Sequence, residues 1–356
     1  MMVAMKTRPS SIVPSLKTLL LLMLVVLAGC RSQAADNQRE ATPKASPPAK
    51  TTPSPEDQTP ARHTPTAAAD QEIYLGQVAP GVQPELFLPG LVSTEGIELF
   101  FALHPNLSEV YFTRVASGRS MILVTYFEDG KWSEPVPAPF SSEFQDVGPF
   151  ITVDGQDLYF WSNRPLTPTT PLMREYQAWR VERDGDGWGA PENLDLPLVS
   201  SDGEWDVSVT EDGRMYYMAN YPSLGGRGLY WTQEVNGVYQ MPEKVDALSD
   251  QGILIELEPV ISPDERFIIF YSVGREDNLT PDGRVGDLYI SFRQPLGKWS
   301  QPQNLGPPIN SEAEEATPAL SPDGRFLFFA SNRDAPTNFP DIYWVSMQAI
   351  ADLLEQ

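Results

Sequence analysis

The chain has 356 residues and a formal net charge of −23 at pH 7, which argues against nucleic acid or an anionic membrane surface as a partner. Hydrophobic residues make up 41% of the sequence, enough for a core, while 35 Pro and 25 Gly indicate the many turns of an all-β chain. Cys30 is the only cysteine, so a disulfide scaffold and a His/Cys zinc site are excluded.

Residues 1–29 have the features of a bacterial export signal. Basic residues precede a short apolar run from Leu19 to Leu27, which is too short to span a membrane. The run ends in Leu27-Ala28-Gly29-Cys30, which looks like a lipobox. This resemblance implies that Cys30 is diacylated and becomes the first mature residue. The alternative is an ordinary secretory signal with a chance cysteine.

The residue after Cys30 is Arg31 rather than Asp, which by resemblance to such lipoproteins implies retention at the outer membrane. A lipid-anchored protein facing the periplasm is expected, with exposure at the cell surface left open. Residues 30–70 are rich in Pro, Ala, Thr and Ser and carry no large apolar side chain. Such a segment cannot offset its ordering entropy, so it predicts a disordered linker.

A turn followed by an aromatic strand recurs along residues 71–346. Its clearest copy is Ser321-Pro322-Asp323-Gly324, which suits a type I turn, followed by a run that begins at Phe326. Equivalent aromatic or aliphatic positions are Tyr111, Tyr159, Tyr216, Ile269 and Phe328, at spacings of 48, 57, 53 and 59 residues. A period of about 50 residues with strand content predicts the blades of a β-propeller.

Each repeat continues with a third strand and a tight hairpin, such as the one at Asp129-Gly130. A Pro then recurs at 135, 191, 242 and 302, where an outer edge strand tolerates the missing N–H. The fifth repeat lacks this outer strand, and residues 347–356 suggest a short C-terminal helix. The sequence therefore predicts an all-β, five-bladed propeller, with six blades as the alternative.

The missing outer strand has a counterpart near residue 90. The segment from Pro84 to Ser93 resembles the segment from Pro191 to Ser200, with the same separation between its Pro and its Ser. We infer that this N-terminal strand completes the last blade and closes the ring. Closure also removes the open edges that a long array of sheets would expose.

The recurring phrase, clearest from Ser321 to Arg333, resembles the WD40-like repeats of TolB-type propellers. The resemblance covers residues 80–346 and implies the fold, together with a role in binding envelope proteins or peptidoglycan-associated proteins. The chain departs from TolB because it has a lipobox and no room for a separate N-terminal α/β domain. It also ends without a peptidoglycan-binding domain.

Few residues in the predicted propeller suit catalysis. His104 is the one histidine there, and it takes a turn position that Ser or Thr fills in other repeats. We therefore expect it to be a turn residue rather than a ligand or a general base. No cofactor is expected.

Carboxylates are the remaining candidates for a site. An acid stands three residues before the position at which each inner strand is expected to open, for example before Pro149, Pro259 and Pro318. These acids are Glu98, Asp146, Glu204, Glu256 and Glu315. One interpretation is a ring at the channel mouth that binds a cationic partner or Ca²⁺. The other is that each acid ties one blade to the next through backbone N–H groups or an Arg such as Arg164 or Arg333.

Two functions follow from these patterns. The first is a lipid-anchored, non-enzymatic scaffold that binds proteins through one mouth of the propeller. The second is a carbohydrate-binding or glycosidase-like propeller that uses the carboxylates. Trp179, Trp231 and Trp344 could stack on sugars, although their place in the third strand favours the core of each blade.

Overall fold

The chain divides into two units, Met1–Gln71 and Glu72–Gln356. The computed structural model describes residues 72–355 except 168, 170, 172, 174–175, 199, 201–202, 204, 246–247, 249–254, 281–284 and 335–338, with the backbone alone at 205 and 255–257. The predicted signal peptide, Cys30 and the linker thus lie outside the described residues. No helix in the described part is long and apolar enough to cross a membrane.

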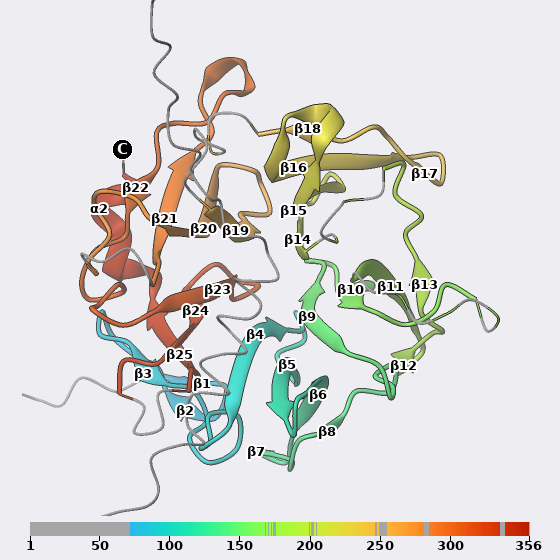
Figure 1. Ribbon diagram of the computed structural model, residues 1–356. Helices are drawn as coiled ribbons and strands as arrows, with labels where there is room; N and C mark the ends of the chain where they lie inside the picture. Colours follow the sequence, from blue (N-terminus) through green and yellow to red (C-terminus); the bar gives the residue numbers. More distant parts are fainter. Residues whose placement is uncertain are drawn as a thin grey trace, which may run out of the picture. The chain divides into compact units, whose positions relative to one another are not determined.

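Five antiparallel sheets are arranged around a common centre as the blades of a propeller (Figure 1). Blade 1 holds β4 (Ile97–Leu103), β5 (Glu109–Ala116), β6 (Arg119–Glu128), β7 (Lys131–Trp132) and β8 (Val136–Pro137). Blade 2 holds β9 (Asp146–Ile151), β10 (Asp157–Ser162), β11 (Gln177–Asp184), β12 (Gly187–Trp188) and β13 (Glu192–Asn193). Blade 3 holds β14 (Trp205–Val209), β15 (Arg214–Tyr221), β16 (Gly226–Val235), β17 (Val238–Tyr239) and β18 (Glu243–Lys244).

Blades 4 and 5 complete the ring. Blade 4 holds β19 (Ile255–Ile261), β20 (Phe267–Val273), β21 (Asp287–Phe292) and β22 (Gln303–Asn304). Blade 5 holds β23 (Glu315–Leu320), β24 (Phe326–Ser331), β25 (Asp341–Ser346) and β3 (Glu85–Leu86). The innermost strands β4, β9, β14, β19 and β23 each contact the next in order, and β23 contacts β4. The predicted five-bladed propeller is confirmed.

The region from 72 to 100 does not supply a sixth blade in the described residues. It holds a two-stranded hairpin, β1 (Ile73–Tyr74) with β2 (Gln77–Val78), followed by β3. Tyr74 of this hairpin packs on Phe326, with ring centroids 4.6 Å apart. The hairpin therefore packs against blade 5.

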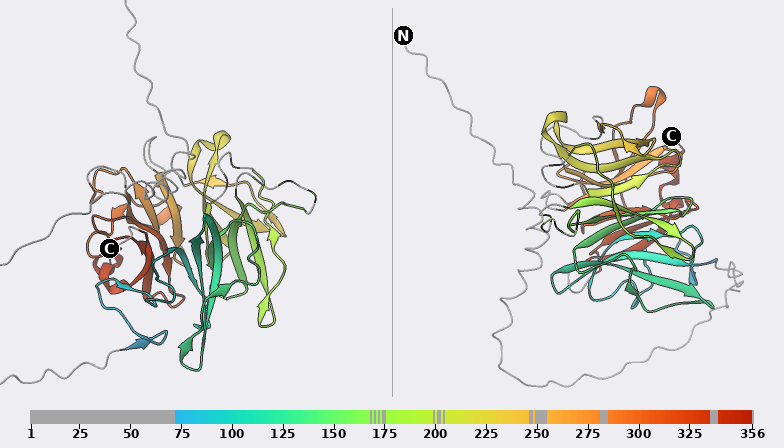
Figure 2. Two further views of the ribbon diagram at one scale, coloured as in Figure 1. Left: turned by 60° about the horizontal axis from the view of Figure 1, so that its bottom comes forward. Right: turned by 90° about the vertical axis from the view of Figure 1, so that its right-hand side faces the viewer.

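The ring closes where β3 pairs with β25, as the sequence predicts. Leu86 lies opposite Tyr343 and Glu85 opposite Trp344 in this antiparallel pair. The next residue, Phe87, has no exposed surface, and its ring meets three other rings with centroids between 5.2 and 5.5 Å away. Those rings belong to Phe101, Phe328 and Trp344. Figure 2 shows the N-terminal segment of the propeller, in blue, beside the C-terminal segment, in red.

The outer strand of each of the first three blades is split into two short pieces. In blade 1 both β7 and β8 pair with β6, and Pro135 lies in the break between them. Pro191 and Pro242 lie in the corresponding breaks of blades 2 and 3. Proline has no N–H to donate to the neighbouring strand, so the ladder is interrupted there.

Each inner strand carries a β-bulge near its middle, where its register with the second strand shifts. The bulge residues have φ between 48° and 65°, in the left-handed region; they are Phe100, Gly148, Asp206, Glu258 and Thr317. The expectation that inner strands open at Pro149, Pro259 and Pro318 is wrong, because β9, β19 and β23 begin three or four residues earlier. The proline follows the bulge residue, where the ladder is already interrupted.

Aromatic side chains fill the space between neighbouring blades. Trp161 and Tyr217 are fully buried between blades 2 and 3. Trp179 and Trp344 of the third strands are also buried, in agreement with a core role, whereas Trp231 is half-buried beneath Arg214. After β25 the chain forms a short 3-10 helix, Met347–Ile350, and then α2 (Ala351–Leu354).

Candidate functional site

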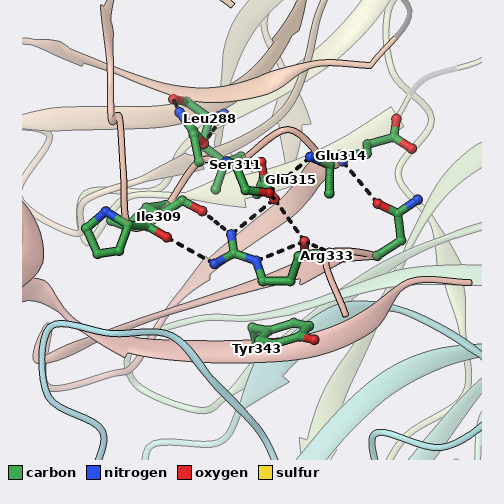
Figure 3. Close-up of polar contacts among 12 residues, drawn as sticks. Leu288, Ile309, Ser311, Glu314, Glu315, Arg333 and Tyr343 are labelled. Atoms are coloured by element: carbon green, nitrogen blue, oxygen red, sulfur yellow. Dashed lines mark hydrogen bonds and ion pairs between the residues drawn. The ribbon is translucent and has the colours of Figure 1, made fainter. Parts of the chain in front are cut away.

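Glu315, one of the predicted ring acids, is bound on all sides in blade 5 (Figure 3). The backbone N–H and the hydroxyl of Ser311 donate to its carboxylate at 2.9 and 2.7 Å. Arg333 donates to the same carboxylate at 3.0 Å, and Ser331 Oγ donates at 2.9 Å. Burial raises the pKa of Glu315 even though the bonds from Ser311 and the charge of Arg333 lower it. We call this arrangement of acid, arginine and hydroxyl the acid clasp.

Arg333 also ties the clasp to the preceding loop. Its guanidinium donates to the carbonyls of Pro308 and Ile309, and it lies over the rings of Phe329 and Tyr343. Its Nε donates to Ser331 Oγ, so the side chain is fixed along its length. The recurring Ser-Asn-Arg phrase therefore supplies the parts that hold the acid.

The acid clasp recurs in blades 1 and 2. Arg164 donates to Asp146 at 2.8 Å, and the N–H of Ser142 donates to the same carboxylate at 2.8 Å. Arg114 donates to Glu98 at 2.7 Å, and Thr94 Oγ1 donates to it at 2.8 Å. The side chains of Glu98, Asp146 and Glu315 have no exposed surface.

The two other predicted ring acids lie in parts that the structure does not describe. Glu204 is outside the described residues, and only the backbone of Glu256 is described, within β19. In blade 4, Arg275 Nε donates to Ser272 Oγ at 2.9 Å, the same bond that Arg333 makes with Ser331. In the three blades where it is described, the acid faces an arginine and a turn rather than the channel.

His104 lies between blades 1 and 2. Its Nδ1 accepts the N–H of Asn106 at 3.2 Å, which leaves Nε2 to donate to the carbonyl of Gly155 at 3.3 Å. Its ring also packs edge-on against Trp188. Both ring nitrogens are thus used in holding the turn, as expected for a turn residue.

The central channel contains a cavity of about 80 Å³ lined by all five inner strands. The bulge residues of the five blades contribute to its wall, and two of them carry carboxyl groups, Asp206 and Glu258. None of the lining residues that the structure describes is Lys, Arg or His. The cavity is therefore an acidic pocket at the axis of the propeller.

A chain of hydrogen bonds joins the bulges of successive blades. The Asp206 carboxylate accepts the N–H of Glu258, and the Glu258 carboxylate accepts the N–H of Thr317. Thr317 Oγ1 in turn accepts the N–H of Phe100 at 3.2 Å. Side chains at the bulges thus connect blades 3, 4, 5 and 1 around the channel.

The two channel carboxyl groups perturb one another. Burial raises the pKa of Asp206 to about 7. Burial also raises the pKa of Glu258 well above its usual range, and the charge of Asp206 raises it further. Both carboxyl groups therefore favour the protonated form more than an exposed Asp or Glu does.

The repeat pattern does not identify Asp206 and Glu258 as candidate site residues. Aligning the blades selects the acids present in every copy, whereas the bulge position holds Phe, Gly, Asp, Glu and Thr in turn. The sequence feature that could have identified the pair is the occurrence of two acids, Asp206 and Glu258, at the same repeat position in adjacent blades. No group of three or more His, Cys, Asp or Glu side chains in the described part is placed to hold a metal.

No protein-family model and no curated protein matches the chain. Solved structures resemble it in fold. TolB from Acinetobacter baumannii aligns at 12% identity and a TM-score of 0.43, over 70% of this chain and 57% of that one. An alpha-L-arabinofuranosidase from Lactobacillus brevis aligns at 12% identity and a TM-score of 0.44, over 72% of this chain and 90% of that one.

A third structure, an RGII complex, aligns at 11% identity and a TM-score of 0.51. The alignment covers 75% of this chain and 92% of that one. At such identities the likeness concerns the fold alone, since one propeller architecture hosts many unrelated activities.

Proposed function

We propose that this chain is a lipid-anchored envelope protein whose propeller is a non-enzymatic, protein-binding scaffold. The observation that carries the proposal is the acid clasp. Glu98, Asp146 and Glu315 are buried and each is bonded to an arginine of its own blade, so they stabilise the blades and are not available to a substrate. The anchor is the lipid on Cys30, and the linker gives the propeller reach from the membrane.

The distribution of charge supports a cationic partner. Residues 1–71 contain 8 Lys and Arg against 5 Asp and Glu, so the other 285 residues contain 17 basic and 43 acidic side chains. The net charge of the propeller unit is therefore −26, larger in magnitude than that of the whole chain. A field of this sign accelerates association with a basic protein surface and weakens as salt is added.

One mouth of the channel presents exposed acids on the turns that join the first two strands of a blade. We call it the turn mouth; its exposed acids are Asp154, Glu211, Asp212, Asp264 and Asp323. The Asp side chains accept bonds from neighbouring hydroxyl groups, as Asp154 does from Thr152 and Asp323 from Ser321, each at 2.6 Å. An Asp→Asn change keeps this acceptor and removes the charge.

The carbohydrate-active alternative has less support. The channel cavity of about 80 Å³ is far below the roughly 300–1,000 Å³ typical of small-molecule pockets. Trp179 and Trp344, which could stack on sugars, are buried in the blades. Hydrolysis of a glycoside by the wild-type chain and its loss in Glu258→Gln would favour this alternative over the scaffold.

The anchor is tested by fractionation. Wild-type protein is expected with the outer membrane, and Cys30→Ala in the soluble periplasmic fraction. Recovery of both proteins in the same fraction would contradict the anchor.

The scaffold is tested by cross-linking in membranes. A variant that carries Asp154→Asn, Asp212→Asn and Asp323→Asn is compared with a charge-matched control, Glu128→Gln, Asp129→Asn and Asp186→Asn, on the outer hairpins. We expect a discrete partner that is captured by wild type and control, lost in the turn-mouth variant and weakened by salt. Equal capture by both variants would contradict the turn mouth as the binding face.

A further inference from the structure

The channel carboxyl groups break the symmetry of the propeller. Acid clasps are built from residues that the repeat supplies in blade after blade, whereas a carboxyl group occurs at the bulge in blades 3 and 4 alone. Both residues, Asp206 and Glu258, adopt φ near 60° there, a conformation that costs a non-glycine residue energy. Their carboxylates accept the N–H of the next bulge, as the hydroxyl of Thr317 also does, so the fold needs an acceptor at this position but not a negative charge.

One carboxylate oxygen of the pair lacks a hydrogen-bond partner among the described residues. Asp206 Oδ1 is buried and accepts no bond, although the Asp206 carboxylate also accepts the N–H of Glu258. The Glu258 side chain is 6% exposed and is bonded to the N–H of Thr317. Burying an acceptor without a donor is costly, so this oxygen has capacity for one further donor or a cation.

The surroundings of the pair supply no cation. The cavity wall contains no Lys, Arg or His in the described part of the chain. The nearest further groups add negative charge, because Glu314 acts on Glu258 and its carboxylate accepts the hydroxyl of Tyr271 at 2.9 Å. Two ionised carboxylates here would repel each other with no compensating charge beside them.

We propose that the channel cavity binds one divalent metal cation, Mg²⁺ or Ca²⁺, with Asp206 and Glu258 as its protein ligands. Both ions prefer oxygen ligands, and Mg²⁺ in particular is held by one or two carboxylates while it keeps several water molecules. A cavity of about 80 Å³ has room for such waters, since one water needs about 10–15 Å³. The site adds to the scaffold function and does not depend on it.

Binding of this cation competes with protons. The cation would bind the ionised carboxylates of Asp206 and Glu258, and protons compete for the same oxygens. Glu314 and Tyr271 are the other titratable groups that face Glu258, and burial raises the pKa of both. Affinity for the cation therefore falls as the pH is lowered.

The test uses the complete chain, treated with chelator and dialysed. Calorimetric titration at pH 8 with MgCl₂ and separately with CaCl₂, at constant ionic strength, is expected to show one saturable site for at least one ion. The dissociation constant is expected on the order of 10⁻⁴–10⁻³ M, with weaker binding at pH 5. Thermal unfolding is expected to shift upward by about 2–4 °C at saturation.

Asp206→Asn and Glu258→Gln keep the acceptors for the two backbone N–H groups and are expected to abolish the saturable site. Asp154→Asn and Asp323→Asn, on the turn mouth, are the matched controls and are expected to retain it. Absence of a saturable site for both ions overturns the proposal, as does unchanged binding in Asp206→Asn and Glu258→Gln. A pH dependence of stability without any effect of the cation also overturns it, because the pair then holds a proton alone.

Discussion

Phe87 lies edge-on against Phe328, with ring centroids 5.3 Å apart, and so joins the start of the propeller to its last blade. Ser93 reinforces this seam, because its hydroxyl donates to the carbonyl of Ile342, 249 residues away in sequence, at 2.9 Å. The seam is thus made by side chains as well as by the short pairing of β3 with β25.

Phe87→Ala is expected to destabilise the propeller by about 3–5 kcal/mol, since it removes a fully buried ring and leaves a cavity. Leu86→Ala is the control, because Leu86 precedes Phe87 in the chain but is 37% exposed, and its cost is expected to be below about 1 kcal/mol. Urea denaturation measures both. Similar costs for the two variants would argue against Phe87 as the anchor of the seam.

Glu315→Gln is expected to cost about 3 kcal/mol of unfolding free energy, because it leaves the buried charge of Arg333 without its counter-ion. The exposed pair between Arg325 and Glu72 offers the comparison, and Glu72→Gln is expected to cost less than about 1 kcal/mol. A double-mutant cycle with Arg333→Met isolates the interaction. A coupling free energy near zero would show that the acid clasp does not stabilise blade 5.

Stability of the metal-free protein is expected to fall as the pH rises from about 4 to about 7. In this window the folded state binds more protons than the unfolded chain, because burial raises the pKa of Asp206 from its usual value to about 7. Asp206→Asn is expected to flatten the thermal unfolding profile between these limits. Part of the slope remains, since burial and Glu98 raise the pKa of Asp341 to about 6. If the wild-type chain and Asp206→Asn gave the same dependence of the unfolding temperature on pH, Asp206 would not be the cause of the loss of stability.

Gly148→Ala is expected to destabilise blade 2 by about 1–3 kcal/mol. The backbone φ there is 65°, and an added Cβ would lie 2.9 Å from Trp161 Cδ1. Gly118→Ala separates the cost of the left-handed backbone from the cost of the contact with Trp161. Gly118 has φ of 76° but no atom within 4 Å of such a Cβ. Thermal unfolding is expected to show the larger loss for Gly148→Ala, and equal losses would remove the contact with Trp161 as a cause.

The repeat determined how much of the fold could be predicted. Turn chemistry such as Ser321 to Gly324 and the aromatic strands are local features, so the blades follow from the sequence, with five as the expected number and six as the alternative. The closing strand was predicted through the likeness of the segment around Leu86 to one inside blade 2. The bulges were not predicted, because a left-handed φ at Asp206 or Glu258 leaves no mark in residue type.

The same reasoning explains what was and was not predicted of the site. The ring acids were predicted because they occur in every repeat. A residue that each blade needs for its structure is expected to repeat in this way. Glu98, Asp146 and Glu315 each bind an arginine of their own blade rather than one of the next blade. The pair of Asp206 and Glu258 depends on two blades meeting at the axis, which no single repeat encodes.

The pairing of β3 with β25 also sets an order of events during synthesis. The strand that holds Leu86 is synthesised early and its partner strand at Tyr343 late. The nascent chain therefore carries an unpaired strand and a solvent-exposed Phe87 through most of translation. The complete disc forms only once nearly every residue is available. Premature termination within blade 5 would therefore leave the ring of blades open, with unpaired strands and exposed apolar side chains that chaperones and proteases recognise.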